Sequence, residues 1–187
     1  MFVAGNHYAG GQDTRFSVVR YGNVMGSRGS VIPFFQSLKG KAKLPITDFN
    51  MTRFMITLEE GVELVWRAFE DMQGGEIYVK KIPSMYVTDL AKVVDPSAEQ
   101  EEVGIRPGEK LHEQMIGRED APFTYEYDTY FKILPQINSW DTDKNRIKNG
   151  VKVAKDFEYN SLNNSEWMSS DTLAEWILEN QNYIGKL

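Results

Sequence analysis

Segments with the residue pattern of strands alternate with segments that have the pattern of helices along this 187-residue chain. Arg15–Tyr21 is rich in β-branched and aromatic residues and predicts a strand, which ends in a glycine-punctuated loop over residues 22–29. The segments Val31–Leu38 and Leu58–Met72 each end before glycine and predict helices. This alternation argues for an α/β or α+β fold.

Further along the chain, the same alternation continues. Extended segments are predicted over Glu76–Val79, Glu102–Ile105 and Tyr125–Ile133, and helices over Thr88–Val94, Lys110–Ile116 and from Ser170 onward. In the last helix, Leu173, Trp176 and Ile177 share one face, which predicts that this face is buried. Trp66 and Phe69 also fall on helical spacings, so we interpret them as core residues.

The beginning of the chain lacks the signature of a complete dinucleotide-binding domain. Such a domain needs a glycine-rich turn between its first strand and helix, where backbone N–H groups approach the pyrophosphate. The glycines nowhere follow the G-x-G-x-x-G spacing, and the nearest cluster, Gly22, Gly26 and Gly29, has a different one. We therefore expect the first half of a dinucleotide-binding fold to be absent.

The composition indicates a soluble globular domain, with 41% hydrophobic and 26% charged residues and no cysteine. The absence of cysteine fits a reducing compartment, and no leader pattern or membrane-length apolar window is present, so we expect a cytoplasmic protein. Although the formal net charge is −6, residues 14–53 hold seven Lys and Arg against Asp48 alone. This distribution argues against a broad nucleic-acid surface and leaves two alternatives for the basic segment, a local anion site or a solvated basic face.

Four long segments and the tail of the chain carry a resemblance to a known family. These segments are RYGNVMGSRGSVIPFF (Arg20–Phe35), LPITDFNMTRFMITLEEGV (Leu44–Val62), GGEIYVKKIPSM (Gly74–Met85), GIRPGEKLHEQMI (Gly104–Ile116) and DFEYNSLNNSEW (Asp156–Trp167). Together they resemble extended short-chain dehydrogenase/reductases of the nucleotide-sugar 4,6-dehydratase group. The tail is similar to the soluble, C5-inverting subgroup that acts on UDP-N-acetylglucosamine.

This resemblance implies an α/β fold that comprises the last Rossmann strands and helices and a small α/β substrate-binding domain. Residues 1–43 would be a remnant of the NADP-binding Rossmann domain with a substrate loop. Residues 44–187 would be mainly substrate-binding domain, interleaved with the last Rossmann elements. Members of the family are homo-oligomers that keep NADP bound, oxidise the sugar at C4, eliminate water across C5 and C6 and return the hydride to C6. The implied product is a UDP 4-keto-6-deoxy sugar for surface-glycan or flagellin modification.

The family's catalytic groups are expected to lie outside this chain. They are a Tyr-x-x-x-Lys pair and an upstream Thr-Asp-Lys, and no tyrosine here has lysine four residues later. The tripeptide Thr142-Asp143-Lys144 has the same residues as the family's Thr-Asp-Lys but lies far from the family's position, so we interpret it as a solvated turn. We therefore assign no catalytic residue and expect the chain alone to be inactive.

The substrate-binding residues of the family match five positions here. Asn23 would contact the sugar diphosphate through its amide, and Thr47 would offer a hydroxyl to a sugar or uridine oxygen. Arg53 and Arg106 would meet phosphate oxygens, for which a guanidinium is suited, and Glu109 would accept hydrogen bonds from ribose hydroxyls. Without the resemblance, Thr47 would be interpreted as an ordinary strand residue, and Arg106 with Glu109 as a surface ion pair.

The run Val24, Met25, Gly26, Ser27 and Arg28 matches the family's cofactor-contacting segment. It follows the carboxyl end of a predicted strand, where α/β sheets place their ligands. An ordinary Gly/Ser turn is the alternative interpretation.

No metal site is predicted, because His7 and His112 are the only histidines and neither has the spacing of a metal-ligand cluster. Besides a dehydratase half, three alternatives stay open: a non-catalytic nucleotide-sugar-binding module, an epimerase of the same superfamily, and a remnant that binds nothing.

Overall fold

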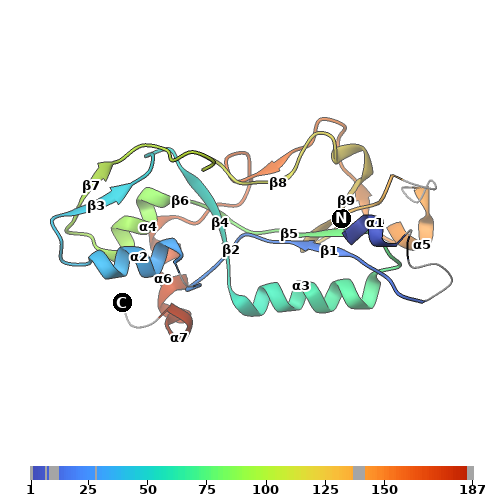
Figure 1. Cartoon of the computed structure of the whole chain (residues 1–187), viewed down its shortest axis with the longest axis horizontal. Helices are drawn as coiled ribbons and strands as arrows, with labels where there is room; N and C mark the ends of the chain where they lie inside the picture. Colours follow the sequence, from blue (N-terminus) through green and yellow to red (C-terminus); the bar gives the residue numbers. More distant parts are fainter. Residues whose placement is uncertain (1, 7, 9–12, 28, 137–141, 185–187) are drawn as a thin grey trace. The chain divides into compact units, whose positions relative to one another are not determined.

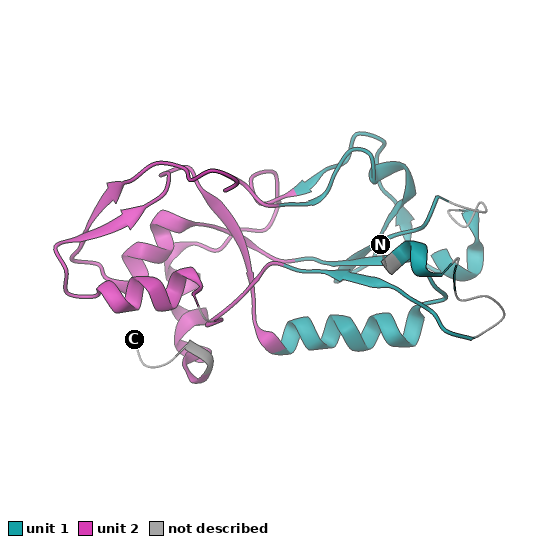
Figure 2. Ribbon diagram, in the orientation of Figure 1, with its two compact units in different colours: residues 1–21, 59–81, 114–159 teal, residues 22–58, 82–113, 160–187 magenta. Residues whose placement is uncertain are grey.

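The computed structural model describes residues 2–6, 8, 13–27, 29–136 and 142–184, and it divides the chain into two compact units. Unit 1 comprises residues 1–21, 59–81 and 114–159, and unit 2 comprises residues 22–58, 82–113 and 160–187 (Figure 2). Each unit is thus assembled from separate stretches of the chain, and its packing depends on residues that are far apart in sequence.

Unit 1 is built on a five-stranded sheet in the order β1-β5-β10-β9-β11. Figure 1 shows β1 and β5 side by side in this sheet. Strand β1 runs parallel to β5, whereas β10 pairs antiparallel with both β5 and β9. Helix α3 contributes Leu64 and Ala68 to a buried cluster that also contains Tyr78 of β5. The elements that lie wholly or partly in unit 1 are α1 (Phe2–Gly5), β1 (Val18–Arg20), α3 (Leu58–Asp71), β5 (Ile77–Lys80), β8 (Gln114–Ile116), η1 (Ala121–Phe123), β9 (Thr124–Glu126), β10 (Tyr130–Ile133), α5 (Lys144–Ile147), β11 (Val151–Lys152) and β12 (Tyr159–Asn160), the last of which pairs with β8.

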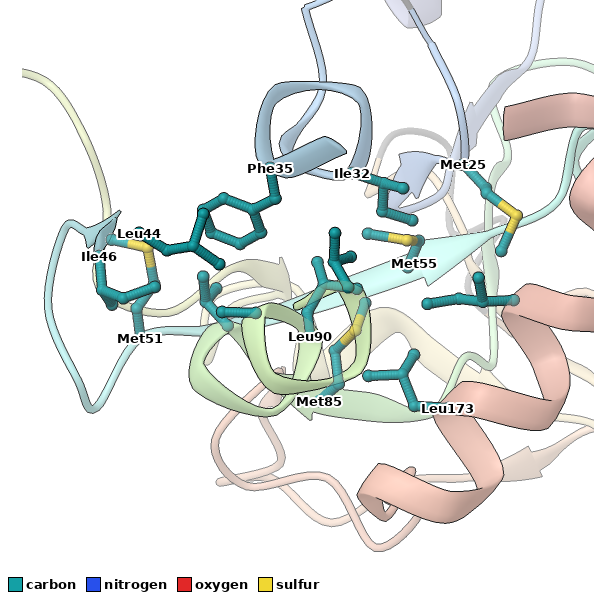
Figure 3. Close-up of a cluster of buried hydrophobic side chains, with 14 residues drawn as sticks. Met25, Ile32, Phe35, Leu44, Ile46, Met51, Met55, Met85, Leu90 and Leu173 are labelled. Atoms are coloured by element: carbon teal, nitrogen blue, oxygen red, sulfur yellow. The ribbon is translucent and has the colours of Figure 1, made fainter. Parts of the chain in front are cut away.

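Unit 2 contains a sheet in the order β2-β4-β6 and a second, two-stranded sheet of β3 and β7. Its elements are β2 (Asn23–Val24), α2 (Val31–Leu38), β3 (Lys43–Ile46), β4 (Thr52–Ile56), β6 (Ser84–Tyr86), α4 (Val87–Val94), β7 (Glu99–Glu102), α6 (Ser170–Glu179) and α7 (Gln181–Ile184). Figure 3 shows how Phe35 of α2, Leu90 of α4 and Leu173 of α6 meet in its core. Four methionines, Met25, Met51, Met55 and Met85, belong to the same cluster, where their flexible side chains can fill irregular gaps.

The structure confirms the α/β fold class and most of the predicted elements. Helix α2 has the predicted bounds Val31–Leu38, and α3 ends one residue before the predicted Met72. In α6, Leu173 and Ile177 are fully buried and Trp176 packs against the same core cluster, as predicted. The segment Tyr125–Ile133 is extended at both ends, where it forms the β9–β10 antiparallel pair. The assignment of residues 1–43 and 44–187 to two domains stays a prediction.

Two element predictions were wrong. The segment Lys110–Ile116 is not a helix, because residues 110–113 are irregular and residues 114–116 form β8. The carbonyls of Lys110 and Leu111 accept hydrogen bonds from the Arg53 guanidinium instead of from backbone amides further along a helix. The extended segment predicted over Glu102–Ile105 also lies too late in the chain, since β7 ends at Glu102.

The interpretation of Trp66 and Phe69 as core residues was also wrong. Their side chains are 64% and 61% exposed. Helix α3 instead buries the face that carries Gly61, Leu64 and Ala68. Helical spacing places Trp66 and Phe69 together, and they do contact each other, but spacing does not determine whether anything covers them. Among the helices in the described ranges, none combines the length and apolar character needed to cross a membrane.

Candidate functional site

A cavity of about 650 Å³ lies within unit 2. Its walls are formed by Asn23, Val24, Ser27, Gly29, Ser30, Val31, Phe34, Phe35, Pro45, Thr47, Met51, Arg53, Val87, Arg106 and Glu109. All five residues that the resemblance assigns to the substrate are among them. Side chains from four separate stretches of the sequence therefore face one space, which we call the unit 2 cavity.

Strand β2 places Asn23 at the edge of this cavity. Asn23 and Val24 pair in parallel with Met55 and Ile56 of β4, and the Met25 amide continues the pairing by donating to the Ile56 carbonyl at 2.8 Å. The Asn23 side chain remains exposed. Its amide group is thus available at the start of β2, in the wall of the cavity.

The five residues of the predicted cofactor run have different environments. Val24 and Ser27 line the unit 2 cavity, whereas the Met25 side chain is only 4% exposed and packs into the core. Gly26 turns the chain at a φ of 70°, a conformation that favours glycine. Arg28 lies outside the described residues. Within the described part of the run, a ligand in the cavity would meet Val24 and Ser27.

Gly22 lets β2 approach β4 closely, and we expect its replacement to disturb this edge of the site. A Cβ at Gly22 would lie 2.6 Å from the Phe54 carbonyl oxygen and 2.7 Å from the Phe54 Cβ. We predict that Gly22→Ala lowers the free energy of unfolding by about 1–3 kcal/mol, the usual cost of overpacking. Urea denaturation would measure this change.

Gly61 of α3 provides a matched control for that substitution. A Cβ there would be 3.9 Å from Tyr21, an ordinary contact, and alanine is the better helix former. Gly61→Ala should therefore stabilise the chain by about 0.5–1 kcal/mol. Equal effects of the two substitutions would contradict the close packing inferred at Gly22.

Arg53 lies below the cavity surface, and its guanidinium is largely engaged by the protein. Nη1 donates to the carbonyls of Thr52 at 2.7 Å and Leu111 at 3.1 Å, and Nη2 donates to the carbonyl of Lys110 at 2.9 Å. Nε lies 3.5 Å from a carboxylate oxygen of Glu113. The side chain is 10% exposed. Arg53 therefore ties the irregular segment 110–113 to the start of β4.

Arg106 and Glu109 belong to a tight turn beside this segment. The Glu109 amide donates to the Arg106 carbonyl at 3.0 Å, and Gly108 within the turn has a φ of 84°. Glu109 Oε1 is 3.5 Å from the Thr47 hydroxyl and 3.9 Å from Arg53 Nη2. Arg106 is exposed, and no carboxylate of the described residues lies within ion-pair distance of its guanidinium. This arrangement directs Glu109 inward and leaves the Arg106 cation available.

A chain of hydrogen bonds holds the other side of segment 110–113. The Thr52 hydroxyl is 2.8 Å from His112 Nδ1 and 2.6 Å from the Ser161 hydroxyl, which accepts from the Glu113 amide at 2.9 Å. Thr52 and Ser161 are fully buried. His112 therefore has a structural partner, and the residues that the structure describes include no cluster of three or more metal-ligating side chains. His7 lies outside the described residues.

The tripeptide Thr142-Asp143-Lys144 is found at the start of α5 in unit 1. Asp143 is the N-cap residue, and its side chain accepts from the Asn145 amide at 2.8 Å. Thr142 and Lys144 are exposed. A capping role at a helix start accounts for Asp143.

Sequence reasoning missed several residues of the cavity wall, most of them on or next to α2. The Ser30 hydroxyl is buried and has no hydrogen-bond partner among the described residues, although Ser30 is the N-cap residue of α2. Phe34 also lines the cavity and is 42% exposed. The available signal was the helical period, which places Ile32 and Phe35 on the core face and Phe34 on another one.

Chemically, the cavity combines cations, a carboxylate and neutral polar groups with an apolar wall. Arg106 is suited to phosphate oxygens, while Asn23, Thr47 and Glu109 can exchange hydrogen bonds with hydroxyl-rich ligands. The ionisable side chains among its described lining residues are Arg53, Arg106 and Glu109. This set is better suited to recognising a charged, hydroxylated ligand than to moving protons.

Comparisons with known proteins give one family match and several relatives of this chain. The family model described as "Polysaccharide biosynthesis protein" matches residues 1–135. The chain is 50% identical over 184 residues to "UDP-N-acetylglucosamine 4,6-dehydratase (inverting)" of Campylobacter jejuni subsp. jejuni serotype O:2, which covers 95% of this chain and 55% of the relative. It is 34% identical over 177 residues to "UDP-glucose 4-epimerase" of Rickettsia felis, which covers 92% of this chain and 51% of that relative.

Among solved structures, the X-ray structure of Pen from Bacillus thuringiensis is similar to the fold of this chain. The TM-score is 0.81 at 32% sequence identity, and the match covers 96% of this chain and 53% of Pen. The chain thus spans about half the length of the curated relatives and of the solved structure that it matches.

Proposed function

Because this chain belongs to the polysaccharide biosynthesis protein family, we propose that it forms the substrate-binding half of an inverting UDP-N-acetylglucosamine 4,6-dehydratase. The 50% identity to a Campylobacter jejuni relative of that name supports this proposal over the epimerase alternative, for which the identity is 34%. In this proposal the chain is one part of an NADP-dependent lyase that yields a UDP 4-keto-6-deoxy sugar. The catalytic pair would lie in the part of the relatives' length that this chain does not span.

The observation that carries the proposal is the convergence of Asn23, Thr47, Arg53, Arg106 and Glu109 on one cavity. A nucleotide sugar requires a cation for its diphosphate and polar groups for its hydroxyls. Arg106 would contact the diphosphate because its guanidinium is exposed and has no carboxylate partner among the described residues. Asn23, Thr47 and Glu109 would hydrogen-bond the hydroxyl and carbonyl groups of the ligand.

Arg53 has a different role in this proposal from a direct grip on phosphate. Since three backbone carbonyls already accept from its terminal nitrogens, Arg53 would mainly position the 106–113 segment and add positive charge below the diphosphate. Nη2 keeps a second N–H beyond the one that it donates to Lys110, and Glu109 Oε1 lies 3.9 Å from this nitrogen.

The described part of the cofactor run fits NADP in a limited way. Val24 and Ser27 line the cavity, so these residues would hold the nicotinamide side of the cofactor next to the sugar. When bound, NADP supplies the hydride acceptor for the chemistry at the sugar. The residues of this chain would orient the sugar and exclude water from that face.

We predict that Arg106→Ala weakens binding of UDP-N-acetylglucosamine by about 10- to 150-fold, the loss expected from about 1.5–3 kcal/mol of charge-assisted hydrogen bonding. Isothermal titration calorimetry of the purified chain would measure the change, with circular dichroism to verify folding. Arg118→Ala is a matched control because Arg118 is an exposed arginine of unit 1 outside the cavity and pairs with Glu158. Unchanged affinity in Arg106→Ala, or equal losses in both variants, would contradict the assigned site.

The same titration separates the proposed dehydratase from an epimerase, and a turnover assay separates it from a non-catalytic binding module. Tighter binding of UDP-glucose than of UDP-N-acetylglucosamine would favour an epimerase, the function named for the Rickettsia felis relative. A non-catalytic nucleotide-sugar-binding module would bind the ligand equally well but give no turnover with any partner polypeptide. A cytoplasmic location, a homo-oligomeric complete enzyme and a role in surface-glycan or flagellin modification are further parts of this proposal.

A further inference from the structure

Phe34 presents an exposed aromatic ring at the wall of the unit 2 cavity. Its side chain is 42% exposed, whereas that of its neighbour Phe35 is 2% exposed and belongs to the core. The two ring centroids are 5.8 Å apart, with an interplanar angle of 40°. The Phe34 amide donates to the Ser30 carbonyl at 3.1 Å within the first turn of α2. The Phe34 ring thus belongs to a regular helix and contacts the buried ring of Phe35.

The position of Phe34 in the cavity is unusual for an exposed aromatic residue of unit 2. Of the aromatic side chains that line the cavity within the described residues, Phe34 is exposed and Phe35 is buried. Phe49, Tyr86 and Trp167 are exposed too, but they do not line the cavity. Tyr86 and Trp167 also stack on each other, with ring centroids 5.0 Å apart. Phe34 is therefore an aromatic surface that faces a ligand-sized space.

The rest of the wall indicates which part of a ligand this ring would meet. Val31 and Pro45 also line the cavity with apolar side chains, and Arg106 and Glu109 provide charge in the same cavity. A nucleoside diphosphate sugar has one flat apolar part, the base, while its remaining parts are charged or rich in hydroxyls. Stacking on an aromatic side chain stabilises a bound base by about 1–3 kcal/mol.

We propose that Phe34 is a further substrate-binding residue that stacks on the nucleobase of the bound nucleotide sugar. The inference rests on the proposed function, since it assigns the base to one wall of the same cavity. The proposal adds a subsite for the planar base of the ligand. It also gives a role to the exposed Phe34 side chain, which packing in unit 2 does not require.

The test compares ligands with and without a base. We expect Phe34→Ala to weaken binding of UDP-N-acetylglucosamine and of UDP by about 5- to 150-fold, which corresponds to the loss of one stacked ring. Binding of inorganic pyrophosphate, which has no base, should stay unchanged in Phe34→Ala but weaken in Arg106→Ala. Phe34→Tyr keeps the ring and should bind UDP within about threefold of the parent chain. Phe49→Ala is the matched control, because Phe49 is 44% exposed and lies outside the cavity wall.

Saturation-transfer NMR provides a readout that general damage to α2 would not reproduce. Transfer from protein aromatic protons should be strongest at H5 and H6 of uracil in the parent chain and should disappear at these protons in Phe34→Ala. UDP binding that is lost in Arg106→Ala and unchanged in Phe34→Ala would overturn the base subsite and leave the proposed function standing. Equal weakening of UDP and pyrophosphate by Phe34→Ala would also overturn the subsite. Absence of UDP and UDP-N-acetylglucosamine binding to the parent chain would overturn both proposals.

Discussion

Replacing Asp71 with alanine is expected to lower the free energy of unfolding by about 3–5 kcal/mol, because it removes one partner of a buried ion pair. Asp71, at the end of α3, accepts from Lys132, Lys148 and the Tyr78 hydroxyl. Lys132 is 1% exposed, and its ammonium also donates to the Arg146 carbonyl. Without the carboxylate, the buried Lys132 charge would lose its ion-pair partner and keep the Arg146 carbonyl and the rings of Tyr78 and Tyr127 near its ammonium. Urea denaturation of the parent and variant chains would measure the loss.

A double variant tests whether the unpaired charge causes that loss. Asp71→Leu combined with Lys132→Met replaces the ion pair by apolar side chains of similar size, and such replacements are often neutral or stabilising. We expect the double variant to be at least 2 kcal/mol more stable than Asp71→Ala, about half of the expected loss. A double variant as unstable as Asp71→Ala would show that shape or the Tyr78 contact, rather than charge, dominates at this position.

The pH dependence of stability gives an independent test of the same ion pair. Burial raises the pKa of Asp71, but hydrogen bonds from Lys132, Lys148 and Tyr78 outweigh burial and hold this pKa below its ordinary value of 3.8. A carboxyl group whose pKa is lowered by folding stabilises the folded state above its unfolded pKa, and the contribution is lost as the pH falls through the folded pKa. The difference in stability between the parent chain and Asp71→Ala should therefore persist at neutral pH and shrink below about pH 4.

Arg53→Ala is expected to lower the free energy of unfolding by about 3–4 kcal/mol, since it removes several charge-assisted hydrogen bonds at once and leaves two carboxylates without their partner. The guanidinium donates to the carbonyls of Thr52, Lys110 and Leu111 and lies near Glu109 and Glu113. Binding of UDP-N-acetylglucosamine should weaken more than in Arg106→Ala, because segment 106–113 loses its attachment to β4 in addition to a nearby cation. Denaturation and calorimetric titration would measure the two effects.

Arg53→Lys separates charge from geometry at the same position. Lysine keeps the positive charge, but a single ammonium cannot reach three carbonyls that a planar guanidinium bridges. We expect Arg53→Lys to recover less than half of the stability lost in Arg53→Ala. If the ligand affinity of Arg53→Ala equalled that of the parent chain, Arg53 would have no positioning role in the site.

Several parts of the fold follow from local patterns in the sequence. Helices α2 and α3 were predicted within one residue of their bounds, because their apolar spacing and following glycines act within a few residues. The buried face of α6, with Leu173 and Ile177, was predicted in the same way. The five proposed substrate residues came from the resemblance of whole segments, and all five line one cavity.

Other parts depend on partners that are distant in sequence. Residues 110–113 have a helix-like pattern, yet the carbonyl of Lys110 accepts a hydrogen bond from the Arg53 guanidinium and not from a helix backbone amide. Arg53 lies 57 positions before Lys110 in the sequence. Trp66 and Phe69 share a helical spacing, but whether that face is covered depends on elements elsewhere in the fold. The buried ion pair of Asp71 and Lys132 joins residues 61 positions apart. The local sequence around either residue gives no signal for this pairing.

The sequence by itself determined the fold class, the family and the main helices, because periodicity, glycine and motif order are local or collinear properties. Only the tertiary structure decided which aromatic rings are buried, which carbonyls accept hydrogen bonds from Arg53 and that Phe34 lines the cavity. Each of these depends on distances between side chains from different elements, since burial and hydrogen bonding act through space. For this reason the candidate substrate residues could be predicted from sequence, whereas the positioning role of Arg53 and the aromatic wall became visible in the folded chain.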